Sequence, residues 1–182
     1  MFRDSFGAAI IPYFSQQFQT ARYSRSRPNP LYALEEQHYD AVILEIVERN
    51  IAWLQKGAPM HSALRADHVP SPDQNGDATV YTEQNGSSLL HIYGTLSLPE
   101  GLTNAGTYYV TLTEEGGTAA SYLAHHCYES DLLEETEIQD NGYSLYIPAA
   151  ALTEGKGYTV TITADTEQGC ILYEPGEFVF TP

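Results

Sequence analysis

A period of two governs the sequence after residue 87, and this pattern limits the fold more than any other feature. Side chains of opposite character alternate along the runs Leu89–Leu98, Tyr108–Thr113, Tyr143–Ile147 and Tyr158–Ala164. In an extended strand, such alternation directs one row of side chains into a core and the other row to the opposite face. Proline or glycine lies shortly after each run, as expected for turns between short strands.

Shorter runs at 119–128, 170–173 and 178–180 add further strand candidates, and 78–83 is a possible short strand. About seven strands separated by turn signals are typical of a β-sandwich. We therefore predict a mainly β protein in which residues 87–182 form an antiparallel sandwich after a helical N-terminal part.

One segment within this half resembles a known family. Leu152–Tyr158, followed by an alternating strand, is similar to the tyrosine corner of fibronectin type III and related immunoglobulin-like domains, in which a leucine precedes the tyrosine that opens strand F. The resemblance implies that Tyr143–Ile147 is strand E, Tyr158–Ala164 is strand F and Ile171–Phe180 is strand G. It covers about half of the chain and implies an immunoglobulin-like sandwich.

Residues 31–56 carry the clearest helical pattern in the chain. Asn29 can cap the start of this helix, and Gly57 can stop its end. The sequence therefore predicts one long amphipathic helix, followed by a linker rich in proline and glycine up to residue 86. The residues at the i, i+3, i+4, i+7 spacing of one face are Tyr39, Ile43, Ile46, Val47, Asn50, Ile51 and Leu54.

The first 30 residues differ in charge from the rest of the chain. Their four arginines and Asp4 give a net charge of +3 in a protein whose total is −16, so the remainder carries −19. Pro12 interrupts any single helix here, and we expect a short helix or an extended arm. The aromatic residues of this arm predict packing on the body or on a neighbouring subunit, so a homo-oligomer formed through residues 1–30 is one option.

The acidic body argues against nucleic acid as the main partner, because nucleic-acid binding depends on Lys and Arg that neutralise phosphates. No apolar run approaches the ~20 residues that cross a bilayer, so we expect no membrane insertion. Glycine-rich phosphate loops and a GxSxG elbow are missing from the sequence. We therefore expect no cofactor, and binding is favoured over catalysis.

His125, His126 and Cys127 form the densest set of metal-type ligands in the sequence. In a strand, His125 and Cys127 point to one face and His126 to the other, so one ion could not bind all three without a bulge. No CxxC or HExxH motif completes a tetrahedral site. A metal-dependent binder or enzyme centred on these residues is therefore an alternative, with ordinary buried or edge histidines favoured.

The two cysteines, Cys127 and Cys170, fall in separate predicted strands. Either they meet as a disulfide between strands, or each is a small buried hydrophobe. The sequence leaves these two interpretations open.

Tyrosine is the chain's commonest aromatic residue, and its ring and hydroxyl suit it to interfaces. We expect a non-enzymatic, surface-associated or assembly module that binds a protein or glycan, adhesin-like or as a structural subunit. A virion or multi-subunit structural protein that docks through residues 1–30 is the related alternative. No export signal is recognisable, although an extracellular, cell-surface or virion location is favoured. The candidate binding residues are Tyr93, Tyr109, Tyr122, Tyr128, Tyr146 and Tyr173.

Overall fold

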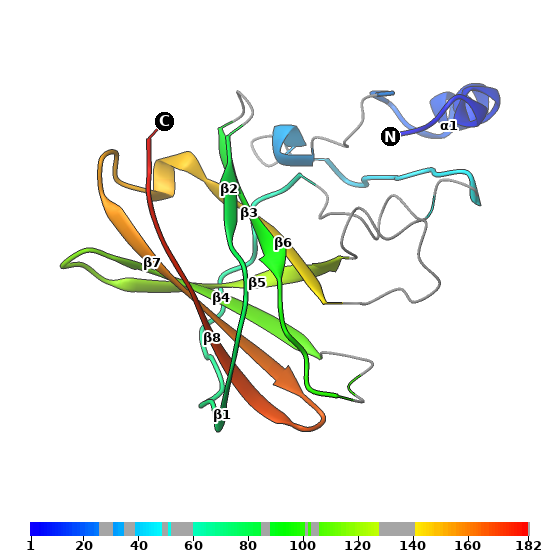
Figure 1. The fold of residues 1–182 in the computed structure, drawn as a ribbon. Coiled ribbons are helices and arrows are strands. Elements are labelled where there is room, and N and C mark those ends of the chain that lie inside the picture. Colours follow the sequence, from blue (N-terminus) through cyan, green and yellow to red (C-terminus); the bar gives the residue numbers. More distant parts are fainter. Residues whose placement is uncertain are drawn as a thin grey trace. The chain divides into compact units, whose positions relative to one another are not determined.

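Two compact units divide the part of the chain that the computed structural model describes. Unit 1 takes the described residues up to His61, and unit 2 takes those from Ser62 onward. Unit 1 holds the helix α1, and unit 2 holds the strands β1 to β8 (Figure 1). The described residues are 1–25, 31–34, 39–48, 51, 60–84, 88–100, 102, 106–127 and 141–181.

Unit 1 begins with a short 3-10 helix, η1 (Phe6–Ile10), which continues into α1 (Ile11–Gln17). A short helix is one of the two options expected here, and Pro12 lies in the first turn of α1, next to the change from 3-10 to α-helical geometry. The first turn has no intrahelical acceptor for its N–H groups, so a residue without an N–H fits there. The N-terminal part of the chain therefore contains a helix, and this helix is short.

The remainder of unit 1 is built around Phe2 and Asp4, which are both buried. Phe2 forms isolated β-bridges with Ser24 and Leu44. The carboxylate of Asp4 accepts hydrogen bonds from the backbone N–H groups of Phe6 and Val47, at 2.8 and 2.9 Å. These contacts join the first residues of the chain to the segment 39–48.

The long helix expected over residues 31–56 is wrong for the residues described there. Leu31–Leu34 is a single 3-10 turn, η2, and residues 39–47 are not helical. The backbone of residues 39–47 forms hydrogen bonds with a distant segment. The Ile43 carbonyl accepts from the Phe2 N–H at 2.8 Å, and the Glu45 N–H donates to the Phe2 carbonyl at 2.9 Å. Pairing with a distant segment has overridden the helical period, which β-branched residues such as Ile43 support only weakly. The expected cap Asn29 and stop Gly57 lie outside the described residues.

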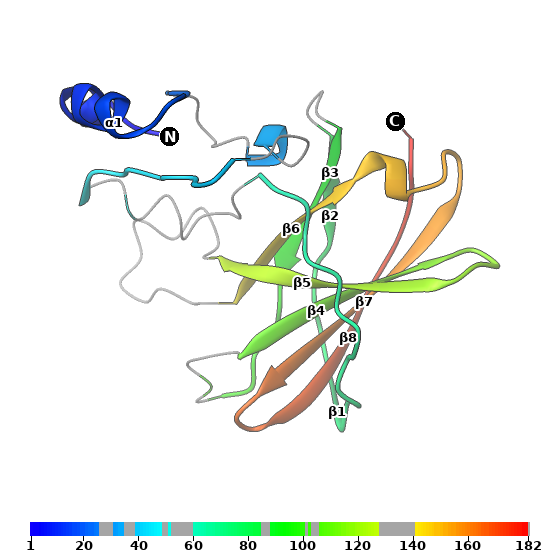
Figure 2. The same cartoon turned by 180° about the vertical axis from the view of Figure 1, so that it is seen from behind.

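The eight strands of unit 2 form one curled, mixed sheet (Figures 1 and 2). Their order is β1-β8-β7-β4-β5-β6-β3-β2, and only the pairing of β1 with β8 is parallel. The mainly β prediction is confirmed at this level, but the sheet is not a clear antiparallel sandwich of seven strands. The strands are β1 (Gln74–Gly76), β2 (Tyr81–Glu83), β3 (Leu89–Thr95), β4 (Thr107–Glu114), β5 (Ala119–Cys127), β6 (Gly142–Pro148), β7 (Gly157–Thr166) and β8 (Gly169–Val179).

Unit 2 also starts earlier than the expected boundary at residue 87. β1 and β2 have three residues each, and most of their side chains are exposed. β2 lies within the possible short strand expected at 78–83, whereas β1 was not expected. Only four residues separate β1 from β2, although the two strands lie at opposite ends of the sheet order. The short connection 77–80 therefore brings the two edges of the sheet towards each other.

The core of unit 2 contains the inward rows that the alternation predicted. Tyr108, Val110 and Leu112 of β4 are buried, and so are Val160 and Ile162 of β7. Burying an aliphatic or aromatic side chain of this size contributes about 1.5–3 kcal/mol. Further core members are Leu96, just after β3, and from the other strands Leu90, Ile92, Tyr143, Leu145, Ile147, Ile171 and Tyr173.

A tyrosine closes the corner between β6 and β7. Tyr158, near the start of β7, accepts a hydrogen bond from the backbone N–H of Thr153 through its hydroxyl oxygen, at 2.7 Å. The same hydroxyl donates to the carboxylate of Glu114 on β4, at 3.0 Å. The 3-10 turn η5 (Ala149–Ala151) lies just before this corner.

Candidate functional site

Four aromatic rings stand in a continuous row across β2, β3 and β6; we call Tyr81, Tyr93, His91 and Tyr146 the aromatic row. Strand register places them together, because Tyr81 is paired with Tyr93, and His91 with Tyr146. The neighbours of His91 in sequence, Leu90 and Ile92, are buried in the core. The row therefore occupies the face of the sheet that points away from the core.

Three rings of the aromatic row stack on one another, and the ring of Tyr81 is tilted against that of Tyr93. His91 lies between Tyr146, with ring centroids 4.3 Å apart, and Tyr93, at 4.6 Å. Tyr81 extends the row from Tyr93 at 5.5 Å, and its side chain is 55% exposed. A ring covered on both faces presents only its edge, so the inner rings offer a partner polar edges, and Tyr81 offers a whole ring face.

Burial and one carboxylate set the protonation of the row. Burial lowers the pKa of His91 below its ordinary value of 6.5, against the opposing effect of Glu83, the cross-strand partner of His91. Burial and Glu83 together raise the pKa of Tyr146. At neutral pH the row therefore holds a neutral imidazole and a protonated phenol, both able to take part in hydrogen bonds.

The ring of His91 also bonds to a serine, since its Nε2 lies 2.8 Å from Ser144 Oγ. With Glu83 on the neighbouring strand, these residues have the types of a Ser–His–acid triad. Ser144, however, is only 1% exposed, and a nucleophile must reach its substrate. The bond between Ser144 and His91 instead holds the imidazole in place within the row.

The other tyrosines expected to bind a partner are distributed differently. Tyr109 is half-buried on the face of β4 opposite the core residues. Tyr122 and Tyr173 are buried in the core, which corrects the expectation that they offer rings to a ligand. Tyr173 donates its hydroxyl to the Ser97 carbonyl at 3.3 Å, and burial raises its pKa to about 12. Tyr128 lies outside the described residues.

The expected metal ligands separate onto two faces of β5. His125 is paired with Ser144, whereas His126 is paired with Tyr143. The His126 ring stacks on that of Tyr108, with centroids 4.0 Å apart. Among the described residues, no group of three or more His, Cys, Asp or Glu side chains is placed to hold a metal ion.

Cys127 and Cys170 are both buried and both present as thiols in the structure. Cys127 ends β5 and Cys170 lies on β8, and the sheet order places β4 and β7 between those two strands. The structure therefore gives no support to a disulfide, and the pairing stays a prediction. Burial, together with Asp165 and Asp73, raises the pKa of Cys170.

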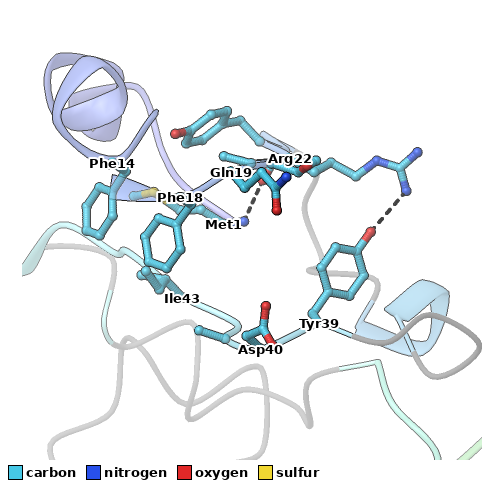
Figure 3. Close-up of a pocket in the computed structure, with 12 residues that line it drawn as sticks. Met1, Phe14, Phe18, Gln19, Arg22, Tyr39, Asp40 and Ile43 are labelled. Atoms are coloured by element: carbon cyan, nitrogen blue, oxygen red, sulfur yellow. Dashed lines mark hydrogen bonds between the residues drawn. The ribbon is translucent and has the colours of Figure 1, made fainter. Parts of the chain in front are cut away.

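Unit 1 contains a separate hollow of about 340 Å³ (Figure 3). Phe14 and Phe18, whose ring centroids are 6.3 Å apart, form an apolar wall. Tyr39 and Asp40 lie across from these rings, and Arg22 donates to the Tyr39 hydroxyl at 3.4 Å (Figure 3). A hollow with one apolar and one polar wall suits a small amphipathic group.

Of the residues at the aromatic row, Tyr93 and Tyr146 were expected from the sequence as candidate binding residues, but Tyr81 and Glu83 were not, and the sequence indicated no common surface for them. Tyr93 and His91 share one face of β3 by their spacing of two, which was a readable signal. The partners from β2 and β6 depend on strand register, which the local pattern does not specify. No helix among the described residues is long and apolar enough to cross a membrane.

No protein-family model matches this sequence, and no curated protein matches it at a significant level.

Proposed function

We propose that the chain is a non-enzymatic binding module in which an immunoglobulin-like unit 2 recognises a protein partner through the aromatic row. The observation that carries this proposal is the row of four rings in contact, three of them stacked, on the outer face of β2, β3 and β6. Stacking fixes the rings before a partner arrives, so little side-chain entropy is lost on binding.

The order of the strands supports the immunoglobulin-like assignment. Such domains pair strands A, B and E within one sheet, and C, F and G within the other. Taken in chain order, β2, β3 and β6 occupy the first set of positions, and they are neighbours here in that order. The other set, β4, β7 and β8, is also neighbouring and in order. β5 pairs with both β4 and β6 and so links the two sets.

The corner tyrosine adds independent support. In immunoglobulin-like domains, the hydroxyl of a tyrosine near the start of strand F bonds to the backbone a few residues upstream. Tyr158 makes this contact with Thr153. The same hydroxyl bonds Glu114 on the strand that corresponds to C.

The charge of unit 2 favours a basic protein as the partner. Its sequence contains 18 acidic residues against Lys56, Arg65 and Lys156, for a net charge of −15. Glu83 lies within the row's own strands, and the exposed face of Tyr81 suits a guanidinium or ammonium group. A glycan would stack on ring faces, which the inner rings of the row use for each other.

Selection of peptides from a random display library against the whole protein tests the proposal. We expect the selected peptides to be basic and to bind Tyr81→Ala at least tenfold more weakly, since removing an interface hot spot costs about 2 kcal/mol or more. Val179→Ala is the control, because Val179 is 64% exposed on β8, outside the strands of the aromatic row. Binders that tolerate Tyr81→Ala, or binding to a glycan array without selected peptides, would contradict a protein partner at the row.

Exposed aromatic residues in unit 1 favour docking on a neighbouring subunit as a second candidate function. Phe6, Tyr13 and Phe18 are 57%, 71% and 41% exposed. Apolar surface of this kind marks interaction sites. In analytical ultracentrifugation, a mass that rises with concentration and falls when residues 1–25 are deleted supports this function, whereas a monomer with and without them rules it out.

A further inference from the structure

β5 and β6 pair over only three residues each, and a separate segment fills the space where they part. His125–Cys127 is paired with Gly142–Ser144, and no further β5–β6 pairs follow. Residues 62–66 lie between the diverging strands, bridging Tyr146 of β6 at Ser62 and Tyr122 of β5 at Arg65. In Figure 2 the chain after residue 60 passes across β5 on its way to β1.

Backbone hydrogen bonds attach this segment to both strands. Ala63 N–H donates to the Tyr146 carbonyl at 2.8 Å. Leu64 accepts from Leu123 N–H at 2.8 Å, and Ala66 N–H donates to the Ser121 carbonyl at 2.9 Å. The segment therefore satisfies edge groups of β5 and β6, as a peptide added to a sheet edge does.

Two side chains of the segment also contact the rest of unit 2. Ala63 is partly buried against the core, and the Arg65 guanidinium lies over the ring of Tyr122, 5.7 Å from its centroid. Leu64 is 67% exposed. A segment attached mainly through its backbone can be replaced by another strand that makes the same bonds.

We propose that residues 62–66 are an exchangeable strand, and that the occupant able to replace them is the same segment of a second copy of this chain. An identical sequence reproduces every backbone bond without new contacts, which makes such exchange a low-cost route to a dimer. The segment begins where unit 1 ends, so exchange carries unit 1 of each copy to unit 2 of the other.

Disulfide trapping between two differently sized chains tests the exchange. One chain carries Ser62→Cys and an affinity tag, the other carries Tyr146→Cys without a tag, and the two are unfolded, mixed and refolded before mild oxidation. The bridge between these positions predicts a linked species with the mass of one tagged and one untagged chain. Asp67→Cys, at an exposed position just outside the segment, replaces Ser62→Cys in the matched control and should give far less of it.

Each outcome decides the question. A linked species in the Ser62 pair, with a dimer of wild-type protein in sedimentation, supports exchange. A dimer without the link means that the copies meet through another surface, such as residues 1–25, and overturns it. A double variant, Ser62→Cys with Tyr146→Cys, that links only within one chain while the mixture stays unlinked overturns it as well. Circular dichroism of each variant confirms that it has folded, and peptide binding by Tyr81→Ala reads out the proposed function separately.

Discussion

The backbone N–H of Thr153 donates a hydrogen bond to the hydroxyl of Tyr158 at 2.7 Å, five residues later in the chain. The same hydroxyl donates a hydrogen bond to the carboxylate of Glu114 on β4, so one side chain joins the turn before β7 to a neighbouring strand. Thr153 Oγ1 also donates to Glu114, at 3.1 Å. The Glu114 carboxylate thus accepts hydrogen bonds from two hydroxyl groups at this corner.

Tyr158→Phe should lower the free energy of unfolding by about 1–3 kcal/mol, because it removes the acceptor of the Thr153 N–H and one donor to Glu114. Denaturant unfolding followed by circular dichroism measures the change. Tyr81→Phe removes a hydroxyl from an exposed ring and should change stability by no more than about 0.5 kcal/mol. Equal effects of the two substitutions would contradict a stabilising corner.

Gly94→Ala should destabilise unit 2 by about 1–3 kcal/mol, because the added methyl group overpacks a tight contact. Its Cβ would lie 2.1 Å from the Thr79 carbonyl oxygen and 2.9 Å from the Tyr143 hydroxyl. Gly157→Ala is the matched control in another strand, where the nearest atom, of Glu115, is 3.7 Å away. Thermal unfolding of both variants should show a lower midpoint for Gly94→Ala alone.

His91 should make stability fall as the pH drops below about 6.5. Burial lowers its pKa in the folded protein, so below its ordinary value the unfolded chain binds a proton that the folded chain rejects. The free energy of unfolding then decreases with falling pH until the folded pKa is passed. His91→Gln should flatten this part of the denaturation profile between pH 7 and 5, and an unchanged slope would show that other groups cause it.

The thiols of Cys127 and Cys170 should react slowly with an aromatic disulfide reagent in the native protein, because both are buried. Asp73→Asn should speed the reaction of Cys170, since Asp73 contributes to its raised pKa. In denaturant, two thiols per chain should react. If none reacts until a reductant is added, the two cysteines form a disulfide, which is one of the two interpretations that the sequence leaves open.

Asp4→Ala should lower the free energy of unfolding of unit 1 by about 1.5–3 kcal/mol, because it leaves the N–H groups of Phe6 and Val47 without a carboxylate acceptor. Asp4→Asn keeps one acceptor oxygen and should cost less. Hydrogen exchange read separately at residues 2–7 and 110–112 should show faster exchange in the first stretch only. Equal loss of protection in both would mean that the change acts on the whole chain.

Much of unit 2 was predictable because its signals are local. The alternation in Tyr108–Thr113 and Tyr158–Ala164 predicted strands there, and β4 and β7 contain both runs. The same reasoning failed at 39–47, where a helical period was overridden by backbone bonds to Phe2. Two members of the aromatic row, Tyr93 and Tyr146, were among the candidate binding residues. Tyr81 was not, although its strand lies within the possible short strand at 78–83.

The sequence by itself determined which side chains face a core, because alternation is a property of neighbouring residues and holds wherever a strand lies in a sheet. Tertiary structure alone decided which strands are neighbours, how β1 and β2 reach opposite edges, and that residues 62–66 enter between β5 and β6. These arrangements depend on hydrogen bonds between segments far apart in the chain. Each such bond joins a backbone N–H to a backbone carbonyl, and every residue except proline has both groups. The side-chain pattern of one segment therefore does not show which other segment it pairs with.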